Sequence, residues 1–324
     1  MSLNLVTGAA GFIGSHLCEN LVRNGDRVRA FIHYNSRNYW GWIEKSVYRN
    51  RIEVMAGDLR DLDSVLRAVE GSDKIYHLGA LIGIPYSYES PLAYVRTNIE
   101  GTYNILEAAR RVGVERILIT STSEVYGTAV YVPIDERHPL QPQSPYSASK
   151  IGADNLALSY HLSFDLPVVI ARPFNTFGPR QSSRAVIPTI ITQLLSGITE
   201  ISLGNLSPRR DLTYVEDTVE AMRMIAGEET FLGKVVNIGS EKDISIGEIF
   251  EKICILMNCR AKVRPENNRI RPDKSEVMRL LCDASLLKKM TGWVAKHSLD
   301  EGLEKTVLWL KNHLDLYKPD IYNR

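Results

Sequence analysis

The first half of the chain alternates short runs of β-branched and apolar residues with longer amphipathic stretches. This alternation is typical of βαβ units and predicts a parallel sheet covered by helices. The predicted strands are 3–7, 28–33, 52–56, 74–78, 117–120 and 168–171, and the predicted helices are 12–23, 62–69, 94–112 and 146–162. A further strand at 235–238 is expected to return to the same sheet.

The junction between the first predicted strand and the first predicted helix is rich in glycine. Small residues there let the backbone turn tightly and approach a pyrophosphate, whose charge is met by free N–H groups at the helix N-terminus. An ordinary strand-to-helix turn is the alternative, but a Gly-Asp-Leu segment after the third strand favours a dinucleotide site. The residues concerned are Gly8, Gly11, Phe12, Ile13 and Gly14 at the junction, and Asp58 and Leu59 after the third strand.

From residue 175 the pattern changes to longer, proline-containing loops mixed with short helices. Such a region suits a substrate-binding part beyond the carboxyl ends of the strands. We therefore expect an α/β protein with a Rossmann-like doubly wound parallel sheet in residues 1–174, joined by a returning strand and flanking helices near 212–257. A smaller mixed substrate-binding subdomain is expected in 175–211 and 258–324.

The end of the second predicted strand bears on the choice of cofactor. A carboxylate there would accept a hydrogen bond from a free ribose 2′-hydroxyl and repel a 2′-phosphate. The segment holds His33, Asn35, Ser36 and Arg37 and no acid. These side chains can surround a phosphate, which favours NADP over NAD, although they are also compatible with a loop that faces solvent.

Composition excludes several classes of partner and site. The chain of 324 residues has 39 Lys+Arg against 38 Asp+Glu, so no overall field favours nucleic acid or an anionic membrane. No apolar run is long enough for a membrane span and no leader pattern is present, which predicts a soluble cytoplasmic protein. The cysteines, Cys18, Cys254, Cys259 and Cys282, have no metal-ligand spacing and are expected to be idle thiols.

Tyr146 and Lys150 lie one helical turn apart on the helix that precedes the sixth strand, after a hydroxyl-rich strand end that contains Thr122. A tyrosine is mostly protonated at neutral pH, and a neighbouring ammonium favours the phenolate needed to remove a proton from a sugar hydroxyl. An isolated pair of this kind is usually a surface pair. Glu124 adds a second base that simple hydride transfer does not need.

Taken together, these segments resemble the extended short-chain dehydrogenases/reductases, and among them the nucleotide-sugar 4,6-dehydratases. The similarity covers the glycine segment 7–17, the segments 57–61, 77–80, 97–102 and 123–127, the Pro-Tyr-Ser-Ala-Ser-Lys stretch 145–150, and the segments 172–180 and 210–217. It implies a triad of Thr122, Tyr146 and Lys150 and an adenine contact at Asp58. It also implies cofactor contacts near Leu78 and Ala80, substrate contacts at Asn175 and Val186, and a diphosphate clamp of Arg210 and Arg271.

Three further segments, 34–42, 81–88 and 181–188, resemble dehydratases of nonulosonic acid pathways such as legionaminic acid synthesis. Those enzymes act on nucleotide-linked N-acetylglucosamine, so the resemblance implies UDP-N-acetylglucosamine as the substrate. It also implies a homodimer built on two paired helices, near 98–112 and 146–162.

The resemblance implies a redox-neutral dehydration. Tyr146 takes the proton from the sugar O4, Glu124 removes the C5 proton, and water leaves from C6 before the hydride returns. Dehydratases acting on deoxythymidine-linked glucose carry Asp-Glu where this chain has Ser123 and Glu124. The proton for the leaving hydroxyl then comes from Glu124 itself or passes through Ser123.

Two other enzymes of the same superfamily remain alternatives. A hexuronate decarboxylase shares the segment around Glu124 but is expected to carry an arginine just before the catalytic tyrosine, where this chain has Gln143. A 4-epimerase does not need an acid at Glu124. An idle nucleotide-binding relative is the alternative outside enzymes, and the intact set of Thr122, Glu124, Tyr146 and Lys150 argues against it.

Overall fold

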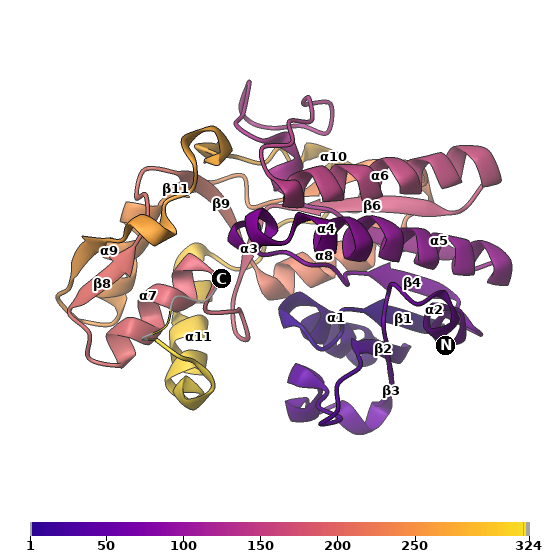
Figure 1. The fold of residues 1–324 in the computed structure, drawn as a ribbon, viewed down its shortest axis with the longest axis horizontal. Coiled ribbons are helices and arrows are strands. Elements are labelled where there is room, and N and C mark those ends of the chain that lie inside the picture. The colour runs from indigo at the N-terminus through magenta and orange to yellow at the C-terminus, as the bar shows by residue number, and fades with distance from the viewer. Residues whose placement is uncertain (1, 320, 322–324) are drawn as a thin grey trace.

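A seven-stranded, all-parallel sheet forms the larger part of the protein, on the right of the view in Figure 1. The computed structural model describes residues 2–319 and 321. The strand order is β10-β6-β5-β4-β1-β2-β3. The bounds are β1 Leu3–Thr7, β2 Arg27–His33, β3 Ile52–Gly57, β4 Lys74–His77, β5 Arg116–Thr120, β6 Val168–Pro173 and β10 Val235–Ile238. Each predicted strand is confirmed to within two residues.

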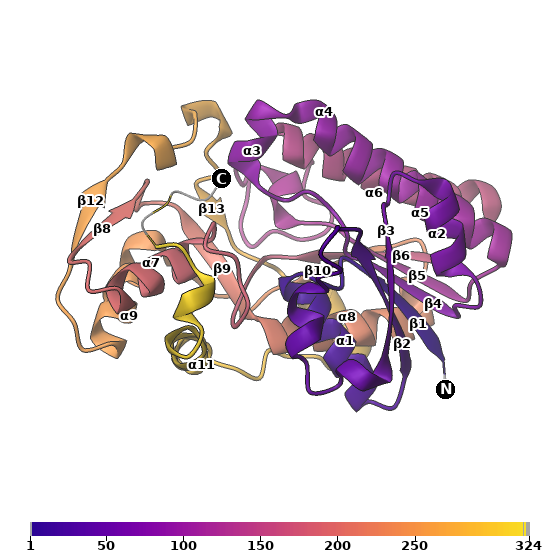
Figure 2. The same ribbon diagram turned by 60° about the horizontal axis from the view of Figure 1, so that its bottom comes forward.

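Helices cover both faces of this sheet. On one face lie α2 (Leu62–Val69), α5 (Gly101–Val112) and α6 (Pro145–Phe164), and on the other lie α1 (Phe12–Arg23) and α8 (Val215–Gly227) (Figures 1 and 2). The predicted α/β class and doubly wound sheet are confirmed. Since the strand order reverses between β1 and β4, ligands are expected at the carboxyl ends of these two strands.

The predicted helix 94–112 differs from the observed one. It starts earlier, with α4 (Pro91–Tyr94), and continues through a π-helical turn (Val95–Glu100) into α5. In this wide turn the Asn98 side chain is buried, accepts from the Leu81 N–H at 2.8 Å and donates to the Leu81 carbonyl at 3.0 Å. The irregular turn therefore ties the helix to the loop after β4, where α3 (Ile84–Glu89) follows.

The smaller part of the protein lies on the left in Figure 1. Its main sheet contains β7 (Asn175–Phe177), β9 (Arg209–Tyr214), β11 (Asp243–Ser245) and β13 (Arg279–Leu280), while β8 (Glu200–Leu203) pairs with β12 (Lys262–Pro265). Its helices are α7 (Val186–Leu195), α9 (Ile246–Leu256) and α11 (Leu299–Lys311), whereas α10 (Ser285–Thr291) contacts α8 and β10 of the larger part (Figure 1). Segments of residues 212–257 contribute to both parts, because α9 contacts α7 while α8 and β10 lie on the large sheet. The domain limits expected from the sequence stay a prediction.

Two sets of side chains join the larger and smaller parts. Trp42, in the turn that follows the loop after β2, meets Trp309 of α11 edge to face, with ring centroids 5.3 Å apart. Arg180, just after β7, donates to the Glu19 carboxylate of α1 at 2.9 Å. The cofactor-side loop and the C-terminal helix are therefore in direct contact.

No helix in the described part of the chain is long and apolar enough to cross a membrane. Within the same residues, no group of three or more His, Cys, Asp and Glu side chains is arranged to hold a metal ion.

Candidate active site

The glycine junction forms a cradle in which side chains have no room. Gly8 has a positive φ of 68°, and a Cβ on Gly14 would lie 2.3 Å from the Gly8 carbonyl oxygen. Helix α1 begins after Gly11 without a side-chain cap and has no acid in its first turn, so the N–H groups of this end are open to an anion. The geometry fits the pyrophosphate of a dinucleotide.

A buried chain of hydrogen bonds underlies this cradle. The Thr7 hydroxyl accepts from the N–H groups of Leu78 and Gly79 at 3.1 and 3.0 Å, so its own hydrogen is available to Nδ1 of His77, 2.8 Å away. Nε2 of His77 faces the Thr102 hydroxyl at 3.1 Å, which itself donates to the Asn98 carbonyl. This network requires a neutral His77 protonated at Nε2.

Burial, with a smaller effect of the Lys150 charge, lowers the pKa of His77 to about 3. The neutral His77 ring, at the end of β4, therefore connects β1 to α5 through its hydrogen bonds with Thr7 and Thr102. The sequence analysis assigned it no role, although it lies within the segment 77–80.

The other proposed cofactor residues lie around the same edge. Asp58, at the end of β3, forms an ion pair with Arg60 at 2.5 Å, and its hydrogen bond to Arg60 lowers the pKa of this carboxyl to about 2. Asn35 uses its amide to close its own loop, donating to the Tyr39 carbonyl at 2.8 Å and accepting from the Tyr39 N–H at 3.0 Å. His33, Ser36 and Arg37 are exposed beside it.

The proposed catalytic hydroxyl and phenol are in contact. Thr122 caps the single turn Ser123–Tyr126, accepts from the Glu124 N–H at 3.2 Å, and hydrogen-bonds to Tyr146. Tyr146 lies in the first turn of α6, which Pro145 and the reciprocal bonds of Ser144 and Ser147 hold in place. Burial and the nearby Glu124 charge raise the pKa of Tyr146.

Lys150 is buried one turn further along α6 and donates to the Thr120 carbonyl at 2.7 Å. Burial lowers the pKa of this ammonium, and the charge of Asp154 opposes that effect. Because Lys150 donates to the Thr120 carbonyl, its effect on the pKa of Tyr146 stays a prediction.

Glu124 lies close to the predicted diphosphate clamp. Its carboxylate is 3.8 Å from Nη1 of Arg271, and Arg271 and Arg210 are 3.9 and 3.7 Å from the carboxylate of Glu276. At these lengths the contacts are ion pairs without close hydrogen bonds. Glu276 was missed by the sequence analysis, and the segment around it carries no periodic signal.

The remaining predicted residues lie on both parts of the protein. On the smaller part, Asn175 begins β7, and its side-chain oxygen is buried without a hydrogen-bond partner among the described residues. Val186 begins α7 and is half-buried. On the larger part, Ser123 is 2% exposed and is the first residue of the turn that carries Glu124.

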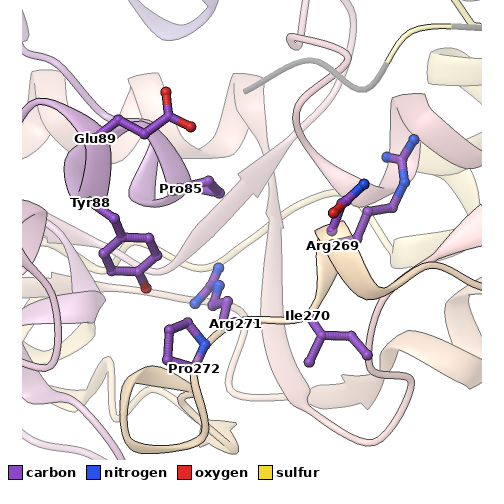
Figure 3. A pocket seen from close by; sticks show the side chains of 8 residues that line it. Pro85, Tyr88, Glu89, Arg269, Ile270, Arg271 and Pro272 are labelled. Carbon is purple, nitrogen blue, oxygen red and sulfur yellow. The ribbon is translucent and has the colours of Figure 1, made fainter.

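A pocket of about 170 Å³ lies between α3 and the loop that carries Arg271. Figure 3 shows Tyr88 of α3 close to Arg271 of the facing loop, and Glu89 farther along the helix. The pocket therefore adjoins the acidic and basic groups around Glu124.

Comparison with known proteins places this architecture in a class. Residues 5–306 match the sequence profile of the family described as GDP-mannose 4,6 dehydratase. Low-salt glycan biosynthesis protein Agl12 of Haloferax volcanii is 35% identical, over 94% of this chain and 96% of its own length. UDP-N-acetyl-alpha-D-glucosaminuronate decarboxylase of Bacillus cytotoxicus is 34% identical, over 95% of this chain and 97% of its own length.

The fold of the large sheet and the glycine cradle define an extended short-chain dehydrogenase/reductase. The dTDP-glucose 4,6-dehydratase DesIV of Streptomyces venezuelae, solved with NAD bound, superimposes with a TM-score of 0.89 at 28% identity, covering 98% of this chain and 99% of its own. The chain belongs to the GDP-mannose 4,6 dehydratase family, whose relatives include nucleotide-sugar dehydratases, epimerases and decarboxylases. The family resemblance is therefore confirmed.

Proposed function

We propose that this protein is a nucleotide-sugar 4,6-dehydratase that acts on UDP-N-acetylglucosamine. The observation that carries the proposal is the position of Glu124, which shares a turn with Thr122 and lies 3.8 Å from Arg271. A carboxylate that close to the Thr122–Tyr146 pair supplies a base beyond the one needed for hydride transfer.

A bound nicotinamide cofactor supplies acceptance and return of a hydride. Tyr146, hydrogen-bonded to Thr122, receives the proton of the sugar O4. Lys150 is buried one turn further along α6, and its positive charge would favour the phenolate form of Tyr146. The 4-ketone makes the C5 proton acidic, and Glu124 removes it.

Departure of the C6 hydroxyl requires a proton. The buried position of Ser123 favours Glu124 as the donor, so that one carboxylate is base and then acid. Arg271 lies 3.8 Å from this carboxylate and provides a positive charge beside it.

The substrate is held from the smaller part of the protein. Arg210 and Arg271 bind the diphosphate, since guanidinium groups match phosphate oxygens in geometry and charge. The unpaired side-chain oxygen of Asn175 accepts from a substrate hydroxyl, and Val186 contacts the nucleotide.

For the cofactor we infer NADP, with NAD as the alternative. This inference is supported by Arg37, exposed in the loop after β2, and His33, exposed at the end of β2, which can surround a 2′-phosphate, and by the absence of a carboxylate at the end of β2. Titration with both cofactors, and with an Arg37→Ala variant, tests this choice. A variant that binds NADP as tightly as the wild type contradicts it.

The dehydratase is favoured over the decarboxylase by Gln143. Its side-chain oxygen accepts from the Thr128 N–H at 2.7 Å, and its amide donates to the Lys274 carbonyl at 3.1 Å. This neutral side chain joins two loops and offers no cation to a substrate carboxylate.

We further propose a cytoplasmic homodimer whose interface is formed by α5 and α6. Tyr103, Leu162 and Phe164 of these helices are 42, 82 and 52% exposed, which gives an apolar surface for a second copy. The mass of the protein in solution tests this assembly.

The decisive experiment is a mass spectrum after incubation with UDP-N-acetylglucosamine and the cofactor. Loss of one water indicates dehydration, whereas an unchanged mass indicates an epimerase or an idle fold; loss of carbon dioxide from the hexuronate indicates a decarboxylase. The variant Glu124→Gln is expected to reduce product formation by about 10²- to 10⁴-fold while cofactor reduction stays detectable. Full product formation by this variant would contradict the proposed role of Glu124.

A further inference from the structure

Arg184 is a cation next to Gly83 that the proposed chemistry does not use. It lies in the loop between β7 and α7, is exposed, and its Nε donates to the Ser182 hydroxyl at 3.3 Å. Among residues 2–319 and 321, no carboxylate lies within ion-pair distance of it. Its guanidinium therefore keeps donors for a ligand.

This guanidinium lies beside the larger part of the protein. A Cβ on Gly83 would lie 3.1 Å from Nη1 of Arg184 and 3.5 Å from the Tyr94 hydroxyl. Tyr94 donates to the Gly83 carbonyl at 2.5 Å, and its ring packs edge to face on Tyr146 with centroids 6.2 Å apart. Arg184 is thus separated from the catalytic tyrosine by one aromatic ring.

The smaller part touches α3 at both ends. Arg184 lies next to Gly83, where α3 begins, and the Ser275 hydroxyl lies 2.6 Å from the Tyr88 hydroxyl, near where α3 ends. Six residues of helix span about 9 Å at 1.5 Å per residue, which is sufficient for a hexose ring and its substituents. Arg271 and Glu124 lie toward the second end, since Arg271 and Tyr88 line the same pocket.

This arrangement orients a sugar. With O4 at Tyr146 and C5 and C6 at Glu124, the opposite edge of the ring, carbons 2 and 3, faces the first end of α3 and Arg184. The same end offers apolar surface, because Ile82 and Tyr86 are 56 and 37% exposed. An acylamino group matches both features, with a carbonyl oxygen for the guanidinium and a methyl group for the apolar surface.

We propose that Arg184 is a specificity-determining residue that donates a hydrogen bond to the carbonyl oxygen of an acylamino group on carbon 2 of the sugar, in a space left open by Gly83. This inference rests on the proposed function for the orientation of the sugar. Arg184 would select this substituent because it donates to the carbonyl oxygen of the acylamino group. The oxygen of a plain hydroxyl group on carbon 2 would lie at a different position.

Binding and turnover are measured separately. Titration calorimetry in a Tyr146→Phe background, which lacks the group that takes the O4 proton and so keeps the substrate intact, compares UDP-N-acetylglucosamine with UDP-glucose. Arg184→Met is expected to weaken binding of the acylamino sugar by about 10- to 100-fold, the range of a hydrogen bond to a charged group, and binding of UDP-glucose by about twofold or less. Gly83→Ala, whose Cβ crowds the guanidinium, is expected to act in the same direction by a smaller factor.

Arg260→Met is the matched control, because Arg260 is equally exposed but lies after α9, away from the cleft. It is expected to leave both affinities unchanged. Equal weakening of both sugars by Arg184→Met, or no weakening, overturns the role of Arg184. Failure of the wild type to remove water from either sugar contradicts the proposed reaction, while the two affinities still decide what Arg184 recognises.

Discussion

The two halves of the candidate site hold their ligands by different means. The cofactor half consists of backbone turns and neutral, fully hydrogen-bonded groups, such as the glycine cradle and the chain from Thr7 through His77 to Thr102. The substrate half consists of charged side chains. Arg210 and Arg271 lie 3.7 and 3.9 Å from the carboxylate of Glu276, and Arg271 lies 3.8 Å from the carboxylate of Glu124. One half is held by hydrogen bonds between neutral groups, and the other has ion pairs that a diphosphate could replace.

This difference reflects the task of each half. In the proposed reaction the cofactor is recycled, so a rigid cradle would be sufficient. A nucleotide-sugar substrate would bring two negative charges and leave as product, so its site would need cations whose carboxylate partners are held loosely enough to be exchanged.

Removal of the clamp is expected to give the largest effect and to be confined to the substrate half. The double variant Arg210→Met, Arg271→Met should weaken binding of a nucleoside diphosphate by about 10³-fold or more, since each charged hydrogen bond contributes about 1.5–3 kcal/mol. Titration calorimetry with UDP measures this loss. Arg209→Met, which removes the neighbouring arginine paired with Asp243 and Glu248, is the control. A comparable loss of cofactor affinity in the double variant would mean that the halves are not separate.

Filling the cradle should damage the cofactor half alone. In Gly14→Ala the new Cβ meets the Gly8 carbonyl at 2.3 Å, and because both groups belong to the backbone the conflict costs about 1–3 kcal/mol of folding free energy. Denaturant unfolding and cofactor titration measure the change. Gly227→Ala, where nothing lies within 4 Å, is the control and should not destabilise the protein. Normal cofactor affinity in Gly14→Ala argues against the cradle.

The neutral network predicts a pH response of the cofactor half. The pKa of His77 falls from 6.5 to about 3 on folding, so between these values the unfolded chain binds more protons and the folded state loses stability as pH falls. One proton corresponds to about 1.4 kcal/mol per pH unit, so His77→Asn should reduce the stability difference between pH 6.5 and 5 by about 2 kcal/mol. Unfolding in denaturant at both pH values measures this difference. An unaltered difference in His77→Asn contradicts a neutral buried ring.

The sequence predicted the cofactor half better than the substrate half for a physical reason. Strands and glycine turns are set by neighbouring residues, so the bounds of β1, α1 and β10 could be predicted to the residue. The π-helical turn around Asn98 could not, because a distant loop at Leu81 shapes it.

Glu276 and Arg184 depend on tertiary contacts in the same way. The parallel pairing of Leu280 with Arg210 brings Glu276 to the clamp from a stretch without periodicity. Arg184 reaches Gly83 only because the smaller part folds back over α3. Neither position carries a local signal that a pattern of hydrophobic and polar residues can supply.

The contact of Trp42 with Trp309 gives the protein an intrinsic fluorescence signal that depends on the distance between its larger and smaller parts. The two indoles belong to different halves, their centroids are 5.3 Å apart, and the His313 ring stacks on Trp309 at 4.3 Å. Indole emission changes with the distance and orientation of neighbouring rings, so any opening between the cofactor loop and α11 alters the fluorescence of the unlabelled chain. Stopped-flow measurement of this emission, compared with that of Trp42→Phe, would therefore show when any such opening between the larger and smaller parts occurs during a single turnover.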